Sequence, residues 1–273
     1  MVWIPTQPSS YVGRRALTRS EPARRTVRGA QAVLRSLAEL LLPLVCAGCA
    51  KPIDSGEPGI VCGRCWSRLR TLASPRCERC GHPTDGRACR WCDNLLPFVR
   101  AARSVCWATS GTGQRIIHAL KYEGWWRVAE GMAQRMDRLD WPVDVREERA
   151  ALAPVPLAAS RQRQRGYNQS ECLARALAPL WRVPMRVDVL ERTRETETQT
   201  RLTPEARVRN VQGAFRATAA ARKSLRGAHV VLVDDVVTTA ATLNACATAL
   251  YESGIRIVSY VTFGRAPALG DRP

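Results

Sequence analysis

The chain has 273 residues, of which 45% are hydrophobic, so it is long enough to form two globular domains. Its formal net charge is +18, and arginine supplies almost all of the positive charge because Lys51, Lys121 and Lys223 are the only lysines. This excess favours polyphosphate or nucleic-acid ligands, although a general arginine bias would give the same charge, and no apolar segment approaches the ~20 residues that insertion across a membrane requires.

The first part of the chain, residues 1–33, is rich in Arg, Pro and Ser and has no hydrophobic periodicity. We predict a disordered basic tail, which is either simply solvated or a contact for nucleic acid. The next segment, residues 34–45, resembles the apolar part of a signal peptide, but Glu39 interrupts it, and cleavage before Cys49 would split a pair of cysteines. We therefore predict a short helix that Pro43 ends, no export signal, and a cytoplasmic protein.

Eight of the eleven cysteines form four C-x-x-C pairs within residues 34–97. Each pair can direct two thiolates at one metal ion, and four thiolates form a closed, structural zinc site. Disulfides would need an oxidising compartment, so the pattern predicts a module with two Zn²⁺ ions, whose ligands are paired either in sequence order or interleaved. His82 is a candidate ninth ligand, although we expect it to face solvent. The expected ligands are Cys46, Cys49, Cys62, Cys65, Cys77, Cys80, Cys89 and Cys92.

The remaining residues, 98–273, alternate between apolar runs typical of strands and segments with helical spacing. This alternation predicts an α/β domain with a mostly parallel central sheet and flanking helices. Residues 191–209 are polar and have no apolar period, which predicts a long mobile loop. The expected strands include 103–108, 151–156, 213–218 and 256–263, and the expected helices include 113–122, 125–139 and 169–180.

A basic segment, ASRQRQRG, follows the second of these strands and precedes a helix for which Asn168 is the predicted N-cap. We expect this segment to be a loop. A pyrophosphate group needs several cationic donors together with backbone N–H groups, so the segment predicts a pyrophosphate site, with a solvated arginine run as the alternative. The predicted pyrophosphate-binding residues are Arg161, Arg163, Arg165 and Gly166.

The string VVLVDDVVTTAAT, at residues 230–242, is the most informative segment of the chain. Its apolar run predicts a buried parallel strand that leads into Asp234 and Asp235, and helical spacing then continues to Gly254. Small residues after the strand let backbone N–H groups face a phosphate, and the paired carboxylates can accept hydrogen bonds from ribose hydroxyls. An ordinary strand whose acids cap the next helix is the alternative. The expected phosphate-binding residues are Val237, Thr238, Thr239, Ala240, Ala241 and Thr242.

This string resembles the signature of type I phosphoribosyltransferases that binds 5-phosphoribosyl 1-pyrophosphate (PRPP). The resemblance implies that fold, with Asp234 and Asp235 at the ribose 2′- and 3′-hydroxyls, residues 238–242 around the 5′-phosphate, and Mg²⁺ bound with PRPP. Two positions depart from the family pattern. Ala240 stands where glycine is usual, and alanine tolerates positive φ poorly. Thr238 stands where purine-salvage members often carry an aspartate base, so the resemblance leans away from purine salvage.

Residues 40–264 together resemble the ComF family of competence-associated proteins. The motifs RGYNQ at 165–169 and HALK at 118–121 match that family, in the same order relative to the cysteine pairs and the acid motif. The resemblance implies a double zinc-ribbon module on a type I phosphoribosyltransferase fold, acting in DNA uptake for natural transformation. It also implies PRPP or a ribose phosphate as ligand, and single-stranded DNA and proteins of the DNA-uptake machinery as possible partners.

Two classes of function stay open. In the first, the protein is a phosphoribosyltransferase, and a nucleophile attacks the anomeric carbon of PRPP. In the second, it is a non-catalytic adaptor that binds single-stranded nucleic acid and uses the same pocket for a nucleotide or a DNA end. The sequence identifies neither an acceptor nor a catalytic residue.

Overall fold

The computed structural model describes residues 44–53, 59–85, 89–109, 111–195, 203–268 and 271. Contacts divide the chain into Met1–Pro43 and Leu44–Pro273, and all of the described residues belong to the second unit. The tail predicted at 1–33 and nearly all of the helix predicted at 34–45 therefore lie outside the described residues.

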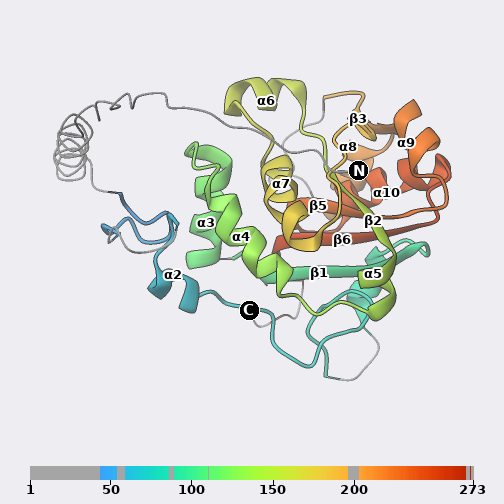
Figure 1. The fold of residues 1–273 in the computed structure, drawn as a ribbon. Coiled ribbons are helices and arrows are strands. Elements are labelled where there is room, and N and C mark those ends of the chain that lie inside the picture. Colours follow the sequence, from blue (N-terminus) through green and yellow to red (C-terminus); the bar gives the residue numbers. More distant parts are fainter. Residues whose placement is uncertain are drawn as a thin grey trace, which may run out of the picture. The chain divides into compact units, whose positions relative to one another are not determined.

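A four-stranded parallel sheet forms the centre of the described unit (Figure 1). Its order is β1 (Val99–Trp107), β6 (Ile257–Arg265), β5 (His229–Val237) and β2 (Arg149–Pro154), and every neighbouring pair is parallel. These strands are nearly continuous apolar runs because both faces of the sheet are covered. The predicted parallel sheet is confirmed. The expected strands 103–108, 151–156 and 256–263 overlap β1, β2 and β6, whereas the expected strand 213–218 belongs to a separate antiparallel sheet.

Helices cover both faces of this sheet: α3 (Thr112–Tyr122), α4 (Val128–Asp137), α7 (Gln169–Trp181) and α10 (Ala241–Glu252). Successive side chains of β5 alternate between the two faces. Val231 and Val233 join the core that contains α3, α4 and α7, whereas Val230 and Leu232 join the core that contains α10. The predicted flanking helices are thus confirmed. None of the described helices is both long and apolar enough to cross a membrane.

Smaller elements surround this central layer. A two-stranded antiparallel sheet stands apart from the main one in the described unit. Short helices join the larger elements or belong to the cysteine-rich part. These elements are β3 (Leu190–Arg192) and β4 (Phe215–Ala217) of the small sheet, the 3₁₀-helix η1 (Arg90–Asn94), and the helices α2 (Gly63–Ser67), α5 (Val143–Glu148), α6 (Ala159–Arg165), α8 (Pro204–Val211) and α9 (Ala219–Ser224).

The prediction of a continuous loop over 191–209 was wrong at both ends. Its first residues belong to β3 and its last residues to α8, while 196–202 lie outside the described residues. The Thr203 hydroxyl caps α8 by accepting a hydrogen bond from the N–H of Ala206, and Pro204 occupies the first turn. This Thr-Pro start is a local helix signal that an analysis of apolar periodicity does not detect.

Gly264 of β6 lies where the sheet meets α3, and packing leaves no room for a side chain there. A Cβ atom at this position would lie 2.8 Å from Ile117 Cδ1 and 2.9 Å from Ala108 Cβ. We therefore expect Gly264→Ala to lower the free energy of unfolding by roughly 1–3 kcal/mol, since that is the usual cost of overpacking a filled core. Urea denaturation of the variant and the wild type measures the difference.

Gly63→Ala is the matched control, because a Cβ atom at Gly63 would meet nothing within 4 Å. This variant should keep the wild-type denaturation midpoint. A Gly264→Ala protein with the same midpoint as the wild type would contradict the packing argument.

Candidate functional site

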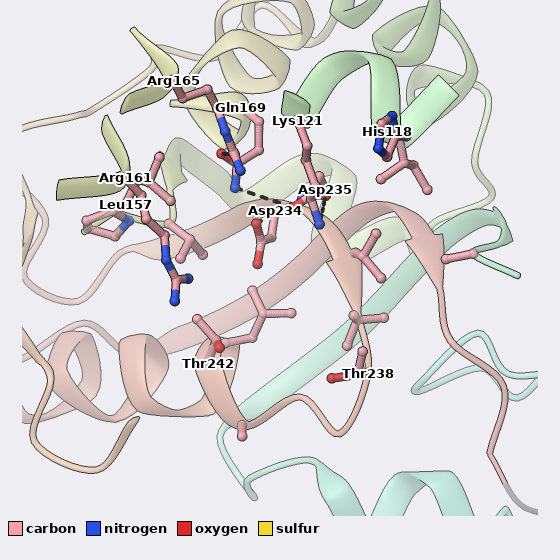
Figure 2. Close-up of a pocket in the computed structure, with 18 of the residues that line it drawn as sticks. His118, Lys121, Leu157, Arg161, Arg165, Gln169, Asp234, Asp235, Thr238 and Thr242 are labelled. Atoms are coloured by element: carbon pink, nitrogen blue, oxygen red, sulfur yellow. Dashed lines mark hydrogen bonds and ion pairs between the residues drawn. The ribbon is translucent and has the colours of Figure 1, made fainter. Parts of the chain in front are cut away.

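A cavity of about 410 Å³ opens at the carboxyl edge of the sheet, where β5 and β2 end (Figure 2). Parallel strands bring their carboxyl ends to one edge, so the segments that follow β5 and β2 meet there. The lining comes from α3, from the connection between β2 and α6, from α6 itself and from the loop that leads into α10. The cavity is large enough for a small ligand.

Asp234 and Asp235 are buried acids of this cavity, and both have partners within the protein. The Ser170 hydroxyl donates to Asp234 Oδ1 at 2.7 Å, and Gln169 Nε2 donates to Asp235 Oδ1 at 3.4 Å. Lys121 Nζ lies 2.5 Å from Asp235 Oδ2. The fold therefore brings the two predicted ribose-binding acids into the cavity and adds polar partners from α3 and α7.

Lys121 is a cavity residue to which the sequence analysis assigned no role. It lies in the last turn of α3, next to the fully buried Leu120. The Tyr167 hydroxyl donates to the Leu120 carbonyl oxygen at 2.5 Å and holds this end of the helix in place. Two signals were available: the HALK motif at 118–121 ends in this lysine, and the chain has only three lysines.

Burial and neighbouring charges shift the ionisation of this cluster. Burial, followed by the charge of Asp235, raises the pKa of Asp234 to about 7, although the Ser170 hydroxyl and Lys121 act in the opposite direction. Burial also opposes the charge on Lys121, but the Asp235 carboxylate outweighs it and raises the pKa of Lys121. Near neutral pH the cavity therefore holds a protonated lysine and an Asp234 carboxyl close to its titration midpoint.

The loop between β5 and α10 passes along the cavity. Ala240 has φ 59° and ψ 5°, which is the left-handed conformation that glycine adopts without strain. Alanine thus takes up the conformation expected of the usual glycine, at a cost of roughly 1–2 kcal/mol. The helix that follows directs the positive end of its dipole towards this loop.

Five of the six predicted phosphate-binding residues line the cavity, and Thr239 does not. The Thr239 hydroxyl is buried, and no described residue forms a hydrogen bond with it. The five lining residues are Val237, Thr238, Ala240, Ala241 and Thr242.

The predicted basic loop is a helix, α6, which ends at Gly166 with a φ of 82°. The prediction was wrong because no residue of α6 is buried, so its sequence carries no apolar period. Arg161 and Arg165, which are four residues apart and share one face of the helix, both line the cavity. Arg163 and Gly166 lie outside the lining, so the structure brings only two of these four predicted residues to the acid pair.

Other residues complete the cavity wall. The Arg165 guanidinium lies 5.3 Å from the centroid of the Tyr122 ring and donates a hydrogen bond to Gln169 Oε1. Arg192 of β3 and His118 of α3 also line the cavity. These residues come from four separate elements, which is why sequence spacing alone did not group them.

The predicted ligand cysteines form two tetrads within the described residues, paired in sequence order rather than interleaved. In each tetrad the Sγ atoms lie within 4.8 Å of one another. The N–H groups of Gly48 and Cys62 donate to Cys46 Sγ at 3.3 and 3.2 Å. Burial raises the pKa of Cys46, but backbone N–H donors outweigh it and lower the pKa to about 7, whereas burial raises the pKa of Cys65 in the same tetrad.

A buried arginine tests whether the second tetrad fits a metal ion. Arg265 of β6 is fully buried, donates to the Cys80 carbonyl oxygen at 2.5 Å and lies 4.0 Å from the centroid of the Trp91 ring. Among the described residues no group accepts a hydrogen bond from its Nη1. Four thiolates on Zn²⁺ carry a net negative charge, which supplies the counter-charge that a buried cation needs. Both tetrads therefore fit structural zinc ribbons.

His82 is buried, contrary to the prediction that it faces solvent. Its Nε2 lies 2.8 Å from Asp271 Oδ1, and its ring stacks on Trp91 with centroids 6.4 Å apart. The ring belongs to the packing around the second tetrad. The partners that bury His82 are distant in sequence, so local residue order could not reveal them.

The second tetrad is joined to the cavity by two sets of contacts. Arg265 pairs in register with Val237, the last residue of β5, and the N–H of Ala266 donates to the Val237 carbonyl at 2.8 Å. On the other side of the loop, the Asn244 side chain of α10 donates to the Asn94 carbonyl at 2.7 Å. The cysteine-rich part therefore contacts both the strand that enters the loop and the helix that leaves it.

Comparisons with known proteins agree with a cysteine-rich part followed by an α/β part. The Double zinc ribbon domain family matches residues 37–96, and the Phosphoribosyl transferase domain family matches residues 166–272. Together with the parallel sheet and the two tetrads, these matches assign a type I phosphoribosyltransferase fold preceded by a zinc-ribbon module.

Full-length relatives cover most of the chain. It is 30% identical to the DNA utilization protein YhgH of Escherichia coli K12 over 234 residues, which are 80% of this chain and 96% of that protein. It is 29% identical to Competence protein F of Haemophilus influenzae over 224 residues, 81% and 90% of the two chains. Among solved structures, the glutamine PRPP amidotransferase of Bacillus subtilis aligns with a TM-score of 0.36 and 18% identity over 54% of this chain and 30% of that chain.

The two tetrads predict two Zn²⁺ ions in each purified chain. Cys77→Ser removes one ligand of the second tetrad and should leave one ion, because the tetrads share no cysteine. The same variant should be less stable, since zinc binding contributes to folding and Arg265 loses part of its counter-charge. Elemental analysis by plasma mass spectrometry gives the ratio of zinc to protein.

Cys172→Ser is the control for loss of a thiol, because Cys172 is half-buried and lies outside both tetrads. It should retain two ions. One ion or none in the wild type would contradict the assignment of two zinc sites.

Asp234 should make the protein less stable as the pH rises. Its pKa in the folded protein, about 7, exceeds the ordinary aspartate pKa of 3.8, so the folded state holds the proton more tightly than the unfolded state. Stability is therefore lost from about pH 4 upwards until the pH has passed the folded pKa. Asp234→Asn avoids this loss, and its advantage over the wild type should grow by roughly 2–3 kcal/mol between about pH 5 and about pH 8.

Urea denaturation at the two pH values measures the change. Asp144→Asn is the control, because Arg100 lowers the pKa of Asp144, which is then ionised throughout this range. The effect of that substitution should not vary with pH. A constant difference between Asp234→Asn and the wild type would disprove the upward shift of the Asp234 pKa.

Proposed function

The chain belongs to the ComF family, and from this membership together with the cavity we propose that it binds PRPP or another ribose phosphate and acts in the handling of DNA taken up during natural transformation. The names of the relatives, a competence protein and a DNA utilization protein, support the cellular part of this proposal. The residues that meet in the cavity support the chemical part.

The proposal rests on three kinds of side-chain group that line one cavity: carboxylates, cations and hydroxyls. Figure 2 shows Asp234 with Arg161 on one side and Lys121 on the other, and Asp235 beside Lys121. Thr238 lies on the loop nearby, and Thr242 lies in the first turn of α10. A ribose phosphate presents hydroxyls, which donate to carboxylates, and a phosphate, which accepts from N–H groups and hydroxyls. Each group of the ligand thus has a complementary group in the wall.

In the bound state, the acids would orient the ribose ring while the loop and the start of α10 hold the 5′-phosphate. Arg161 and Arg165 would face the pyrophosphate and stabilise the negative charge that develops on it as it leaves. Mg²⁺ carried on the pyrophosphate would neutralise part of the same charge. Side chains from four elements would then exclude water from one face of the sugar.

Binding without turnover is the second candidate, and Thr238 favours it. Purine-salvage members of the fold often have an aspartate base at this position, and threonine does not titrate near neutral pH. Any acceptor would therefore have to bring a good nucleophile of its own. In this candidate the cavity holds a nucleotide or a DNA end, and the net charge of +18 attracts the rest of the strand.

Arg161 and Arg163 give a matched pair of variants for testing the ligand. They lie on the same helix, but only Arg161 lines the cavity. We expect Arg161→Ala to weaken PRPP binding by about 10- to 100-fold, which corresponds to the loss of a charge-assisted hydrogen bond of about 1.5–3 kcal/mol. Arg163→Ala should bind within about 2-fold of the wild type. Isothermal titration calorimetry measures all three affinities.

Equal losses in the two variants would mean that the cavity is not where PRPP binds. No heat with the wild type would remove PRPP as the ligand. A pyrophosphate-release assay on the same proteins distinguishes the candidates, because an enzyme releases pyrophosphate when its acceptor is present, whereas an adaptor binds and releases PRPP unchanged.

A further inference from the structure

The acid pair of the cavity has a cation of its own within the protein. Lys121 Nζ lies 2.5 Å from Asp235 Oδ2, and the Asp235 side chain is only 4% exposed. Gln169 Nε2 approaches the other oxygen, Asp235 Oδ1, at 3.4 Å. An ammonium group therefore faces one oxygen of this carboxylate as an ion pair, and an amide N–H faces the other.

Rigid structure holds Lys121 in this position. Leu120, the residue before it, is fully buried in the core beneath α3, and the Tyr167 hydroxyl fixes the Leu120 carbonyl oxygen. Figure 2 shows the Lys121 side chain directed at Asp235. The backbone that carries Lys121 is therefore fixed, and its side chain, which is 23% exposed, faces the cavity with its ammonium group at Asp235.

This ammonium group competes with any divalent metal ion at the same carboxylates. Paired carboxylates are typical Mg²⁺ ligands, since Mg²⁺ prefers oxygen donors. A Mg²⁺ ion on Asp235 would lie close to the Lys121 ammonium, and two cations at short range in a buried site repel each other strongly. Arg161, Arg165 and Arg192 also line the cavity, so the protein itself supplies positive charge for a phosphate.

We propose that Lys121 takes the place of a divalent cation at the acid pair, so that a ribose phosphate binds with no metal ion on Asp234 or Asp235. This assignment makes Lys121 a specificity-determining residue of the site and rests on the function proposed above. A Mg²⁺ ion bound to the pyrophosphate of PRPP is part of the ligand and is not an ion held by the acid pair. Ribose 5-phosphate has no pyrophosphate, so its binding shows whether the acid pair itself needs a metal ion.

The first test is metal binding alone, which requires no sugar ligand. The full chain is equilibrated in buffer cleared of metal by a chelating resin, because EDTA would also remove metal from the cysteine tetrads. Mn²⁺, a probe for Mg²⁺ sites, is then titrated and followed by electron paramagnetic resonance. The wild type should bind no Mn²⁺ at the acid pair, and Lys121→Met should gain one site. Lys121→Arg keeps the charge and should behave as the wild type does.

The second test is calorimetric titration of ribose 5-phosphate with and without Mg²⁺. The affinity of the wild type for ribose 5-phosphate should agree within about 2-fold in the two buffers. Without Mg²⁺, Lys121→Met should bind ribose 5-phosphate at least about 10-fold more weakly than the wild type, and added Mg²⁺ should restore much of that affinity. Ser170→Ala is the control. It removes the hydrogen bond to Asp234 and leaves Lys121 in place, so its binding should stay independent of Mg²⁺.

Three results would overturn the proposal: an Mn²⁺ site at the acid pair of the wild type, wild-type binding of ribose 5-phosphate only with Mg²⁺, or a Lys121→Met protein that binds without Mg²⁺ as well as the wild type does. If Lys121→Met fails to fold, the wild type and Lys121→Arg still give both metal readouts. Absence of binding of either PRPP or ribose 5-phosphate by the wild type would disprove the proposed function, and a Lys121→Met protein that gains an Mn²⁺ site would still show that Lys121 excludes a metal ion.

Discussion

Parallel pairing of β5 with β2 and β6 is the constraint on which the cavity depends. Because these strands run in the same direction, their carboxyl ends share one edge of the sheet. The acid pair near the end of β5 and the connection from β2 to α6 therefore meet in the cavity, and Arg265 at the end of β6 pairs with Val237 of β5. An antiparallel neighbour would carry one of these groups to the opposite edge. Strand direction thus determines where the polar groups meet, and the residues after each strand determine the chemistry.

Positive charge inside the protein is the second constraint: Arg103 and Arg265 are buried, the Lys121 side chain is 23% exposed, and each has a different kind of partner. Lys121 faces the Asp235 carboxylate, Arg103 donates to backbone carbonyl oxygens of Glu78 and Asp140, and Arg265 faces Cys80 and its tetrad. Removing a cation from water is costly unless such partners surround it. In a chain with a net charge of +18, internal carboxylates are scarce, and carbonyl oxygens and thiolates take over this role.

The features that the sequence predicted are those encoded in short segments. The acid motif, the cysteine pairs and the apolar strands each lie within a few consecutive residues, so the fold class and the content of both tetrads followed from them. Helix α6 was missed because none of its residues is buried, and periodicity reports only a buried face. The role of Lys121 and the burial of His82 depend on partners far away in the sequence, Asp235 and Asp271, which meet them only in the folded chain.

The zinc-ribbon module contacts the elements on both sides of the loop between β5 and α10. Ala240 holds a left-handed conformation that alanine adopts only where its surroundings over-determine it. The N–H of Asn244 donates to the Ala240 carbonyl at 2.7 Å, and the Asn244 side chain is tied to Asn94 at the end of the second ribbon. At the other end of the loop, Val237 is held by the strand that carries Arg265, whose guanidinium lies against the second tetrad. The cysteine-rich part therefore contacts both the strand that enters the loop and the helix that follows Ala240.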